Sequence, residues 1–321
     1  MAYSESVLFR ARARLAQAKQ AAEEESSRRI DAIYEQYPRL RQIDRQLAAT
    51  MAKVVAASFQ QGDPRQAVEE AKKENLALQQ ERSWILQAAD LEEADLEQHP
   101  ICAECGGSGY VGARMCECLR ELCRQEQKKE LSSLLAGRES FDGFRLQYYS
   151  EAPDSATGLS PREIMTYNFD RCRQYATGFG PGAPSLLFTG GPGLGKTFLS
   201  ACIARTVAEN GYSVVYDTAG KMFSDFETAK FGGEQELTKK YLACDLLIID
   251  DLGTEMVTQF TQSALYTVIN TRLMEGRATI VSTNLSKNQM EGRYLPAIAS
   301  RLWGTYETLV FLGDDIRMMK R

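Results

Sequence analysis

The sequence lacks long apolar runs. No aliphatic stretch is longer than Leu246–Ile249, whereas a membrane-spanning helix needs about 20 apolar residues. The N-terminus MAYSESVLFRARARLAQAKQ becomes charged at once and has neither an apolar signal core nor a small-residue cleavage site. We therefore expect a cytoplasmic protein with no membrane partner.

The sequence also lacks a basic excess. Its 321 residues include 38 Lys and Arg against 43 Asp and Glu, for a formal net charge of −5. Residues 1–98, 99–135 and 136–321 carry net charges of −3, 0 and −2, so no zone is a basic module. A domain held on nucleic acid by bulk charge is thereby excluded. The 44% hydrophobic and 25% charged residues are ordinary for a globular protein, here of about two domains.

Residues 1–98 contain a single glycine, Gly62, and read as a helical or coiled-coil N-terminal region of two or three amphipathic helices. We place helix boundaries at Tyr37-Pro38 and at Gly62-Asp63-Pro64, because proline disfavours helix before it and suits the first turn after it. Apolar residues at helical spacing predict one buried face on each helix: Leu40, Ile43, Leu47, Met51 and Val54, then Val68, Ala71, Leu78, Ile85 and Ala89. Such faces are compatible with a simple bundle and with partner docking.

Residues 136–164 are rich in glycine and proline and read as a linker, with a helix from Pro161 to Tyr175 beginning inside it. Thereafter the apolar runs SLLF, YSVVY, LLII and ATIVS alternate with helical segments. This pattern predicts an α/β domain over residues 165–321 with a parallel sheet.

The segment GGPGLGKT matches the phosphate-loop pattern G-x-x-x-x-G-K-[ST] between a predicted strand and a predicted helix that opens at Phe198. Its backbone N–H groups and the helix N-terminus suit phosphate binding. Lys196 is predicted to bridge the terminal phosphates of ATP, and Thr197 to ligate Mg²⁺. The candidate nucleotide-binding residues are Gly190, Gly191, Pro192, Gly193, Leu194, Gly195, Lys196, Thr197 and Phe198.

Two further strand ends carry polar side chains. Asp250 and Asp251 follow the run LLII, and we expect Asp250 to hold Mg²⁺ and Asp251 to orient or deprotonate the attacking water. Asn284 follows the run ATIVST and is placed to touch the terminal phosphate or the water. Alone, an acidic pair can be a helix cap and an asparagine a turn residue, so the phosphate loop carries the interpretation.

Together, GGPGLGKT, LLIIDDLGTE, IVSTN and SRLW resemble a P-loop AAA+ ATPase, and more narrowly the bacterial helicase loaders of DnaC/DnaI type, to which the IstB-like transposase helpers are close. The resemblance covers residues 165–321. It implies an ATPase that engages a hexameric replicative helicase and single-stranded DNA and self-assembles with ATP. It also implies that Arg301 is an arginine finger and Arg317 a second sensor, although each can instead be a solvated surface residue. Only Met318–Arg321 follow Arg317, so we expect no C-terminal lid.

Cys102-x2-Cys105 and Cys116-x-Cys118 within residues 99–135 predict a small zinc module, because four thiolates on two short turns suit tetrahedral Zn²⁺. An iron–sulfur cluster or a redox pair is the alternative, and His99 or Cys123 lies close enough to replace a ligand. We interpret Cys172, Cys202 and Cys244 as buried apolar residues.

The leading hypothesis is ATP-dependent loading of the replicative helicase onto single-stranded DNA during replication initiation. An ATPase that assists a transposase and a nucleotide-gated scaffold with little hydrolysis are the alternatives. Lys221, Phe223 and Lys230 are the candidate DNA contacts, against packing and solvation as the simpler interpretation.

Overall fold

The computed structural model describes residues 3–58, 64–134, 139–153, 158–233 and 236–319. The chain divides into two compact units. The first contains Met1–Ala13 and Glu117–Arg321, and the second contains Arg14–Cys116. Among the described residues, no helix combines the length and the apolar character that crossing a membrane requires.

The second unit is mainly helical, as the sequence predicted. The long helix α1 (Glu5–Gln36), whose first residues belong to the first unit, ends one residue before Tyr37, and α2 (Pro38–Ser58) begins at the following proline, which confirms that boundary. Helix α3 (Pro64–Ala88) begins with proline, and Gly62 and Asp63 lie outside the described residues. A short 3-10 helix, η1 (Glu93–Leu96), follows.

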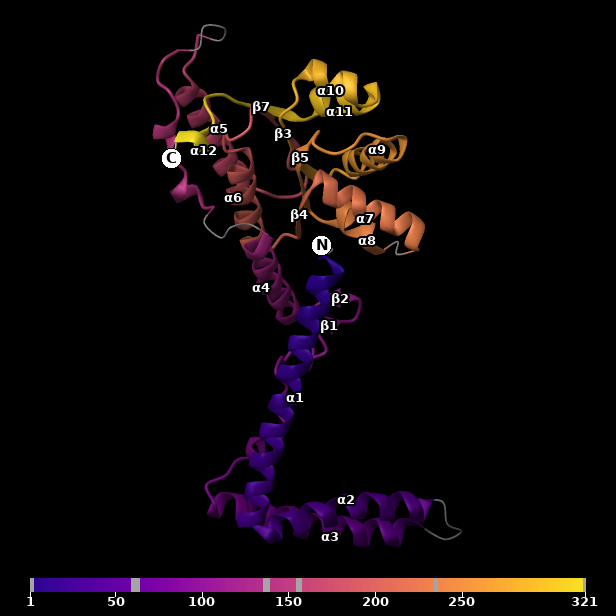
Figure 1. The fold of residues 1–321 in the computed structure, drawn as a ribbon. Coiled ribbons are helices and arrows are strands. Elements are labelled where there is room, and N and C mark those ends of the chain that lie inside the picture. The colour runs from indigo at the N-terminus through magenta and orange to yellow at the C-terminus, as the bar shows by residue number, and fades with distance from the viewer. Residues whose placement is uncertain (1–2, 59–63, 135–138, 154–157, 234–235, 320–321) are drawn as a thin grey trace. The chain divides into compact units, whose positions relative to one another are not determined.

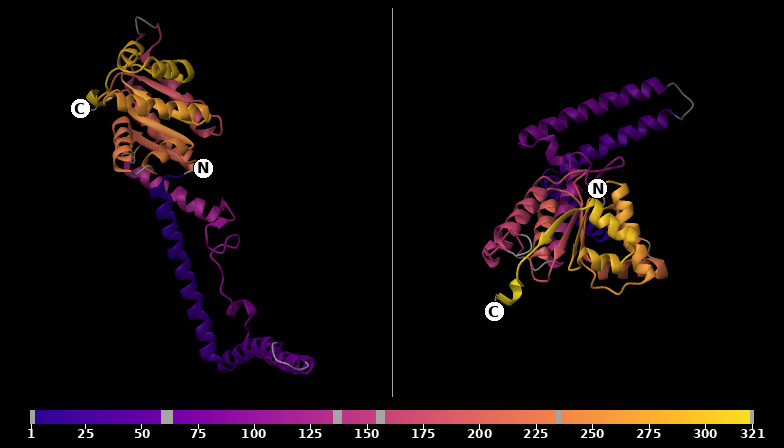
Figure 2. Two further views of the ribbon diagram at one scale, coloured as in Figure 1. Left: turned by 90° about the vertical axis from the view of Figure 1, so that its right-hand side faces the viewer. Right: turned by 90° about the horizontal axis from the view of Figure 1, so that it is seen from above.

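Helices α2 and α3 lie side by side, as both views show (Figures 1 and 2). The predicted face of α2 is confirmed at Leu40 and Ile43, which are fully buried. On α3, Leu78 is buried as expected, whereas Leu86 is buried in place of its half-buried neighbour Ile85. The side chains of Met51, Val54 and Val68 lie outside the described residues. A charged cluster reinforces this unit, since Arg82 Nε donates to Asp44 at 2.6 Å.

The first unit contains a five-stranded sheet in the order β4-β5-β6-β3-β7, with every neighbouring pair parallel. Its strands are β3 (Leu186–Gly190), β4 (Val214–Thr218), β5 (Leu246–Leu252), β6 (Ala278–Thr283) and β7 (Glu307–Phe311). The sequence predicted the first four. It missed β7, although Leu309–Leu312 is an unbroken apolar run as long as the run of β5.

Helices cover both faces of this sheet (Figure 1). On one face lie α5 (Pro161–Thr177) and α6 (Lys196–Glu209), and on the other α7 (Ala219–Gly232), α8 (Glu236–Ala243), α9 (Gln259–Met274) and α11 (Pro296–Thr305). The remaining elements are α4 (Glu117–Leu134), η2 (Phe141–Gly143), η3 (Leu146–Tyr148), α10 (Lys287–Arg293) and α12 (Ile316–Met319).

Coverage on both faces explains why the strands are apolar without alternation. Along β5, Leu246 and Ile248 enter the core beneath α6, whereas Leu247 and Ile249 enter the core beneath α9. This parallel α/β sheet, preceded in the sequence by a helical region, is consistent with the P-loop AAA+ core that the sequence predicted.

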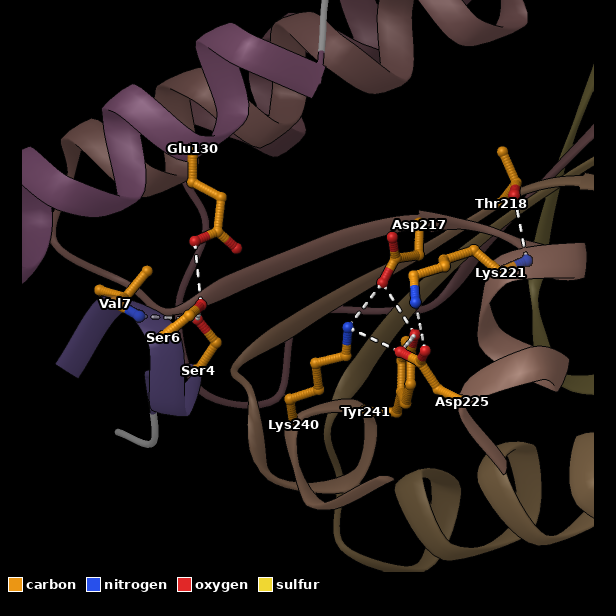
Figure 3. Close-up of polar contacts among 10 residues, drawn as sticks. All are labelled: Ser4, Ser6, Val7, Glu130, Asp217, Thr218, Lys221, Asp225, Lys240 and Tyr241. Atoms are coloured by element: carbon orange, nitrogen blue, oxygen red, sulfur yellow. Dashed lines mark hydrogen bonds and ion pairs between the residues drawn. The ribbon is translucent and has the colours of Figure 1, made fainter. Parts of the chain in front are cut away.

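The start of the described chain, from Tyr3 on, packs within the first unit. Tyr3 and Val7 are buried, and the Tyr3 hydroxyl donates to the carbonyl of Gly211 at 3.4 Å. Ser6 Oγ donates to Glu130 on α4 at 3.2 Å (Figure 3). These contacts join the start of α1 to α4 and to the loop before β4.

Candidate nucleotide site and cysteine cluster

The carboxyl ends of β3, β5 and β6 meet at one edge of the sheet, where ligands bind in open parallel sheets. Because β6 lies between β3 and β5, the loops after all three strands converge. A cavity of about 430 Å³ lies there. Predicted site residues that line it are Pro192, Gly193, Leu194, Gly195, Lys196, Thr197, Phe198, Asp251, Asn284 and Arg317. Gly190, Gly191 and Asp250 do not line it, although Gly190 and Gly191 belong to the same loop.

The backbone conformation of the loop requires glycine at two positions. Gly195 caps α6 in the left-handed conformation with φ 91°, which L side chains rarely adopt. Gly193 has φ 72°, and a Cβ there would meet Asp315 Oδ1 at 1.8 Å. The loop therefore keeps its backbone close to neighbouring groups and directs the N-terminus of α6 toward the cavity.

Lys196 is 5% exposed and folds back onto its own loop. Its Nζ donates to the carbonyls of Gly190 at 2.8 Å and Gly191 at 2.6 Å, and to Asn284 Oδ1 at 2.7 Å. Burial lowers the pKa of Lys196, while Asp251 and Asp250 oppose that shift. The ammonium thus has three protein acceptors that anionic oxygens can replace.

The two aspartates point to different environments. Asp250 is 3% exposed on the α6 face of β5, where Tyr216 and Ser282 both donate to its carboxylate. Asp251 has φ 55°, and the pairing of β5 with β6 shifts register between Ile249 and Leu252. This irregularity re-aims Asp251 into the cavity. Burial, then Asp250, raises its pKa, and Lys196 and Arg317 oppose the shift.

The donor set suits Mg²⁺, which prefers carboxylate and hydroxyl oxygens together with phosphates. Thr197 at the start of α6 and Asp251 supply such oxygens on the cavity wall, and Asp250 lies one residue before Asp251. Thr197 and Asp250 would hold the ion, whose chemistry is to neutralise charge on the phosphates. Thr197 and Asp251 therefore fit the predicted cofactor from the cavity wall, whereas Asp250, which does not line the cavity, stays a predicted ligand.

One wall of the cavity was missed by the sequence reasoning. Residues of the predicted linker line it: Glu139, Gly143, Phe144, Arg145, Tyr148 and Tyr149. The Tyr149 hydroxyl donates to the Leu194 carbonyl at 2.9 Å, and the Phe144 ring lies 5.8 Å from that of Phe198. The aromatic residues of FDGFRLQYY were the available signal, since a solvated linker rarely carries so many.

The two predicted arginines have different surroundings. Arg317 follows β7 and lines the cavity. Arg301 on α11 does not line it; its guanidinium donates to Asn270 Oδ1 at 3.0 Å and lies 4.8 Å from the centre of the Tyr266 ring. Arg301 is thus held by α9 of its own chain, away from the chain's own phosphate loop. A role in a neighbouring chain's site stays a prediction.

The four predicted zinc ligands come together. The Sγ atoms of Cys102, Cys105, Cys116 and Cys118 all lie within 4.8 Å of one another. Those of Cys102 and Cys116 are 3.7 Å apart, close to the about 3.8 Å that tetrahedral Zn–S bonds of about 2.3 Å require. The cluster can therefore hold a metal ion of this kind.

Local backbone shapes the cysteine cluster. The hairpin β1 (Tyr110–Val111) and β2 (Arg114–Met115) carries the chain back to Cys116. The N–H of Gly109 donates to Cys105 Sγ at 3.3 Å, a contact that favours the thiolate. Gly109 has φ 80°, so glycine permits this turn.

The other candidate ligands lie apart from this cluster. His99 is exposed and Cys123 is fully buried, and neither joins the four thiols. Burial raises the pKa of Cys123 to about 11, which disfavours the thiolate. The eight cysteines all lie within the described residues and form no disulfide. Cys172, Cys202 and Cys244 are buried, as predicted.

The predicted DNA-contacting residues on α7 have different environments. Phe223 is 3% exposed in the core, so the prediction that it contacts DNA is wrong: a buried ring cannot stack on a base. Lys221 pairs with Asp225 (Figure 3). Lys230 lies 5.0 Å from the centre of the Phe260 ring and is exposed. For both lysines, DNA contact stays a prediction.

Known proteins resemble part of this chain. Residues 176–297 match the family described as "IstB-like ATP binding protein". "Replicative helicase loader DnaC" of Buchnera aphidicola subsp. Baizongia pistaciae (strain Bp) is 28% identical over 118 residues, which are 35% of this chain and 48% of that protein. The protein of the same name from Escherichia coli (strain K12) is 28% identical over 123 residues, 37% of this chain and 50% of that protein.

The chain thus spans about half the length of these curated relatives. A solved structure, "Crystal structure of the DnaC helicase loader", aligns with a TM-score of 0.46 and 20% identity over 54% of this chain and 97% of that chain. The family match and the relatives' names agree with the resemblance that the sequence motifs predicted. The findings show similarity to IstB-like ATP-binding proteins over residues 176–297 and, at low identity, to proteins named replicative helicase loader DnaC.

Proposed function

We propose that the chain is an ATP-dependent loader of a replicative DNA helicase. The observation that carries the proposal is the convergence of the loop of Lys196 with Asp251 and Asn284 around one cavity, in a chain whose curated relatives are named replicative helicase loaders. In this role the protein acts in the cytoplasm on a hexameric helicase and single-stranded DNA.

The proposed chemistry is hydrolysis of ATP to ADP and phosphate. Gly190–Phe198 bind the phosphates, with Lys196 on the terminal ones, and Thr197 and Asp250 hold Mg²⁺. Asp251 acts as the base for the attacking water and Asn284 positions that water, while Arg317 approaches the phosphates from the cavity wall. Arg301 completes the site of a neighbouring chain when ATP drives self-assembly.

The proposed organisation assigns residues 1–98 to partner docking, 99–135 to a zinc module, 136–164 to a connection and 165–321 to the ATPase. An exposed aromatic residue supports docking by the helical region: Trp84 on α3 is 70% exposed, and Leu76 is 50% exposed. Tryptophan is among the commonest anchors of protein interfaces. Zn²⁺ on the four thiolates would be structural, because it leaves no open coordination position.

A second function has its own support. The second function is an ATPase that assists a transposase, as the resemblance of the sequence motifs to IstB-like proteins implies, and residues 176–297 match a family described as IstB-like ATP binding protein. That function does not require the cysteine cluster, which favours the loader. A scaffold that binds ATP with little hydrolysis would differ from the loader and from the transposase-assisting ATPase in its low rate of ATP turnover.

Mass measurement of a complex tests the proposal. The zinc-loaded protein is mixed with the replicative helicase of the same organism, with ATP and without nucleotide, and the masses are measured by light scattering. A complex of defined stoichiometry is the expected result. Absence of a complex under both conditions contradicts helicase loading, and ATP hydrolysis stimulated by a transposase instead would favour the second function.

A further inference from the structure

Tyr216 is a buried tyrosine, on a strand outside the recognised motifs, whose hydroxyl contacts the predicted Mg²⁺ ligand Asp250. It lies on β4 and is 7% exposed. Its hydroxyl donates to Asp250 Oδ2 at 2.7 Å. Tyr216 pairs in register with Ile248 of β5, so its side chain reaches along the same face of the sheet to the residue two positions on.

Three donors fix the Asp250 carboxylate. Ser282 Oγ and the N–H of Asp251 donate to Oδ1, while Tyr216 donates to Oδ2. A carboxylate offers about four acceptor sites. Among the described residues, these contacts leave one site on Oδ2, beside the tyrosine hydroxyl.

We infer that Tyr216 is a positioning residue that orients the Asp250 carboxylate for Mg²⁺. This inference rests on the proposed ATP site. Without the tyrosine hydroxyl, Oδ2 loses its only described donor and the carboxylate can rotate about its bond to Cβ. Ser282 acts in the same way on Oδ1. Ser282 Oγ also accepts from the N–H of Asp251 at 3.1 Å, so Tyr216 is the more specific probe of the Asp250 carboxylate.

The alternative is that Tyr216 only satisfies a buried carboxylate and supports the fold. The two accounts differ in one observable. A positioning role changes ATP affinity only when Mg²⁺ is present, whereas a purely structural role changes it equally with and without Mg²⁺, or leaves it unchanged.

Titration calorimetry with ATP, across a Mg²⁺ series and in EDTA, separates these accounts. Tyr216→Phe removes the hydroxyl and keeps the buried ring. Loss of a hydrogen bond to a charged group predicts an about tenfold higher Mg²⁺ concentration at half-maximal effect. Affinity in EDTA should equal that of the wild type. Ser282→Ala should shift the midpoint in the same direction and replaces the first variant if that one does not fold.

Tyr241→Phe is the matched control. The Tyr241 hydroxyl donates to Asp217 at 2.8 Å and Asp225 at 2.7 Å on the opposite face of the sheet (Figure 3). Its loss should leave the Mg²⁺ midpoint unchanged. An unchanged midpoint in Tyr216→Phe, or equal losses with and without Mg²⁺, overturns the inference alone. A wild-type protein that binds no ATP overturns the proposed function as well.

Discussion

The Nζ of Lys196 donates a hydrogen bond to Oδ1 of Asn284 at 2.7 Å. This contact joins the helix after β3 to the end of β6 and connects two residues that separate motifs predicted. Because the ammonium also donates to the Gly190 and Gly191 carbonyls, a phosphate must displace protein acceptors to reach it. ATP binding therefore exchanges hydrogen bonds within the loop for charge-assisted bonds to phosphate.

Asp251→Asn should abolish hydrolysis and preserve ATP binding. General-base catalysis contributes about 10²- to 10⁴-fold, and an amide cannot accept the proton. Steady-state phosphate release should fall by at least about 100-fold, whereas the ATP dissociation constant should stay close to that of the wild type. Full activity in this variant would show that Asp251 is not the base.

The pH dependence of hydrolysis follows from the same residue. Burial and Asp250 raise the pKa of Asp251, and only the ionised carboxylate accepts a proton. As the pH is lowered, the rate of hydrolysis should therefore begin to fall at a higher pH than it would if the base were an aspartate of ordinary pKa. A rate–pH profile at saturating ATP checks this, and Asp251→Asn should lack that acidic limb.

Arg301→Ala alone should not hydrolyse ATP, and mixing it with a second inactive variant should restore ATPase activity. An arginine finger acting between chains is worth about 10³- to 10⁵-fold. In a mixture of the two variants, an Arg301→Ala chain still has Lys196 in its own site. A neighbouring Lys196→Ala chain can supply Arg301 to that site. Recovered ATPase activity in the mixture is expected. Activity no greater than that of the separate variants would contradict a finger acting in trans.

Zinc content tests the cysteine cluster. Elemental analysis should find one zinc per chain, and Cys105→Ser should lose most of it, because a hydroxyl replaces a thiolate ligand. Cys172→Ser is the matched control, since Cys172 is buried in the core of the first unit and is not one of the four clustered cysteines. Iron with visible absorbance would indicate an iron–sulfur cluster, and absence of metal from freshly purified wild type would contradict the prediction.

Trp84→Ala should weaken helicase binding and leave ATP binding unchanged. Loss of an aromatic anchor costs an interface at least about 2 kcal/mol, or about 30-fold in affinity. Lys72→Ala on the same helix α3 provides the control. If Trp84→Ala and Lys72→Ala bind the helicase equally well, Trp84 is not part of the docking surface.

The nucleotide motifs and the cysteine pairs could be predicted because each combines fixed spacing with a residue type that its chemistry requires. Lys196, Asp251 and Asn284 could therefore be assigned to one site from the sequence alone. Tyr216 and Tyr149 could not, because their roles depend on register and tertiary contact. The burial of Phe223 was missed for a related reason: the orientation of α7 on the sheet is set by packing rather than by the spacing of its residues.

ATP titration of the wild type and of Lys196→Ala tests the central claim most directly. The wild-type protein should bind ATP in the presence of Mg²⁺, and Lys196→Ala should lose at least about 100-fold in affinity, because it removes the charge closest to the phosphates. Its circular dichroism should remain that of the wild type, and Lys230→Ala should bind normally. Equal ATP affinity in the wild type and Lys196→Ala would contradict the nucleotide site.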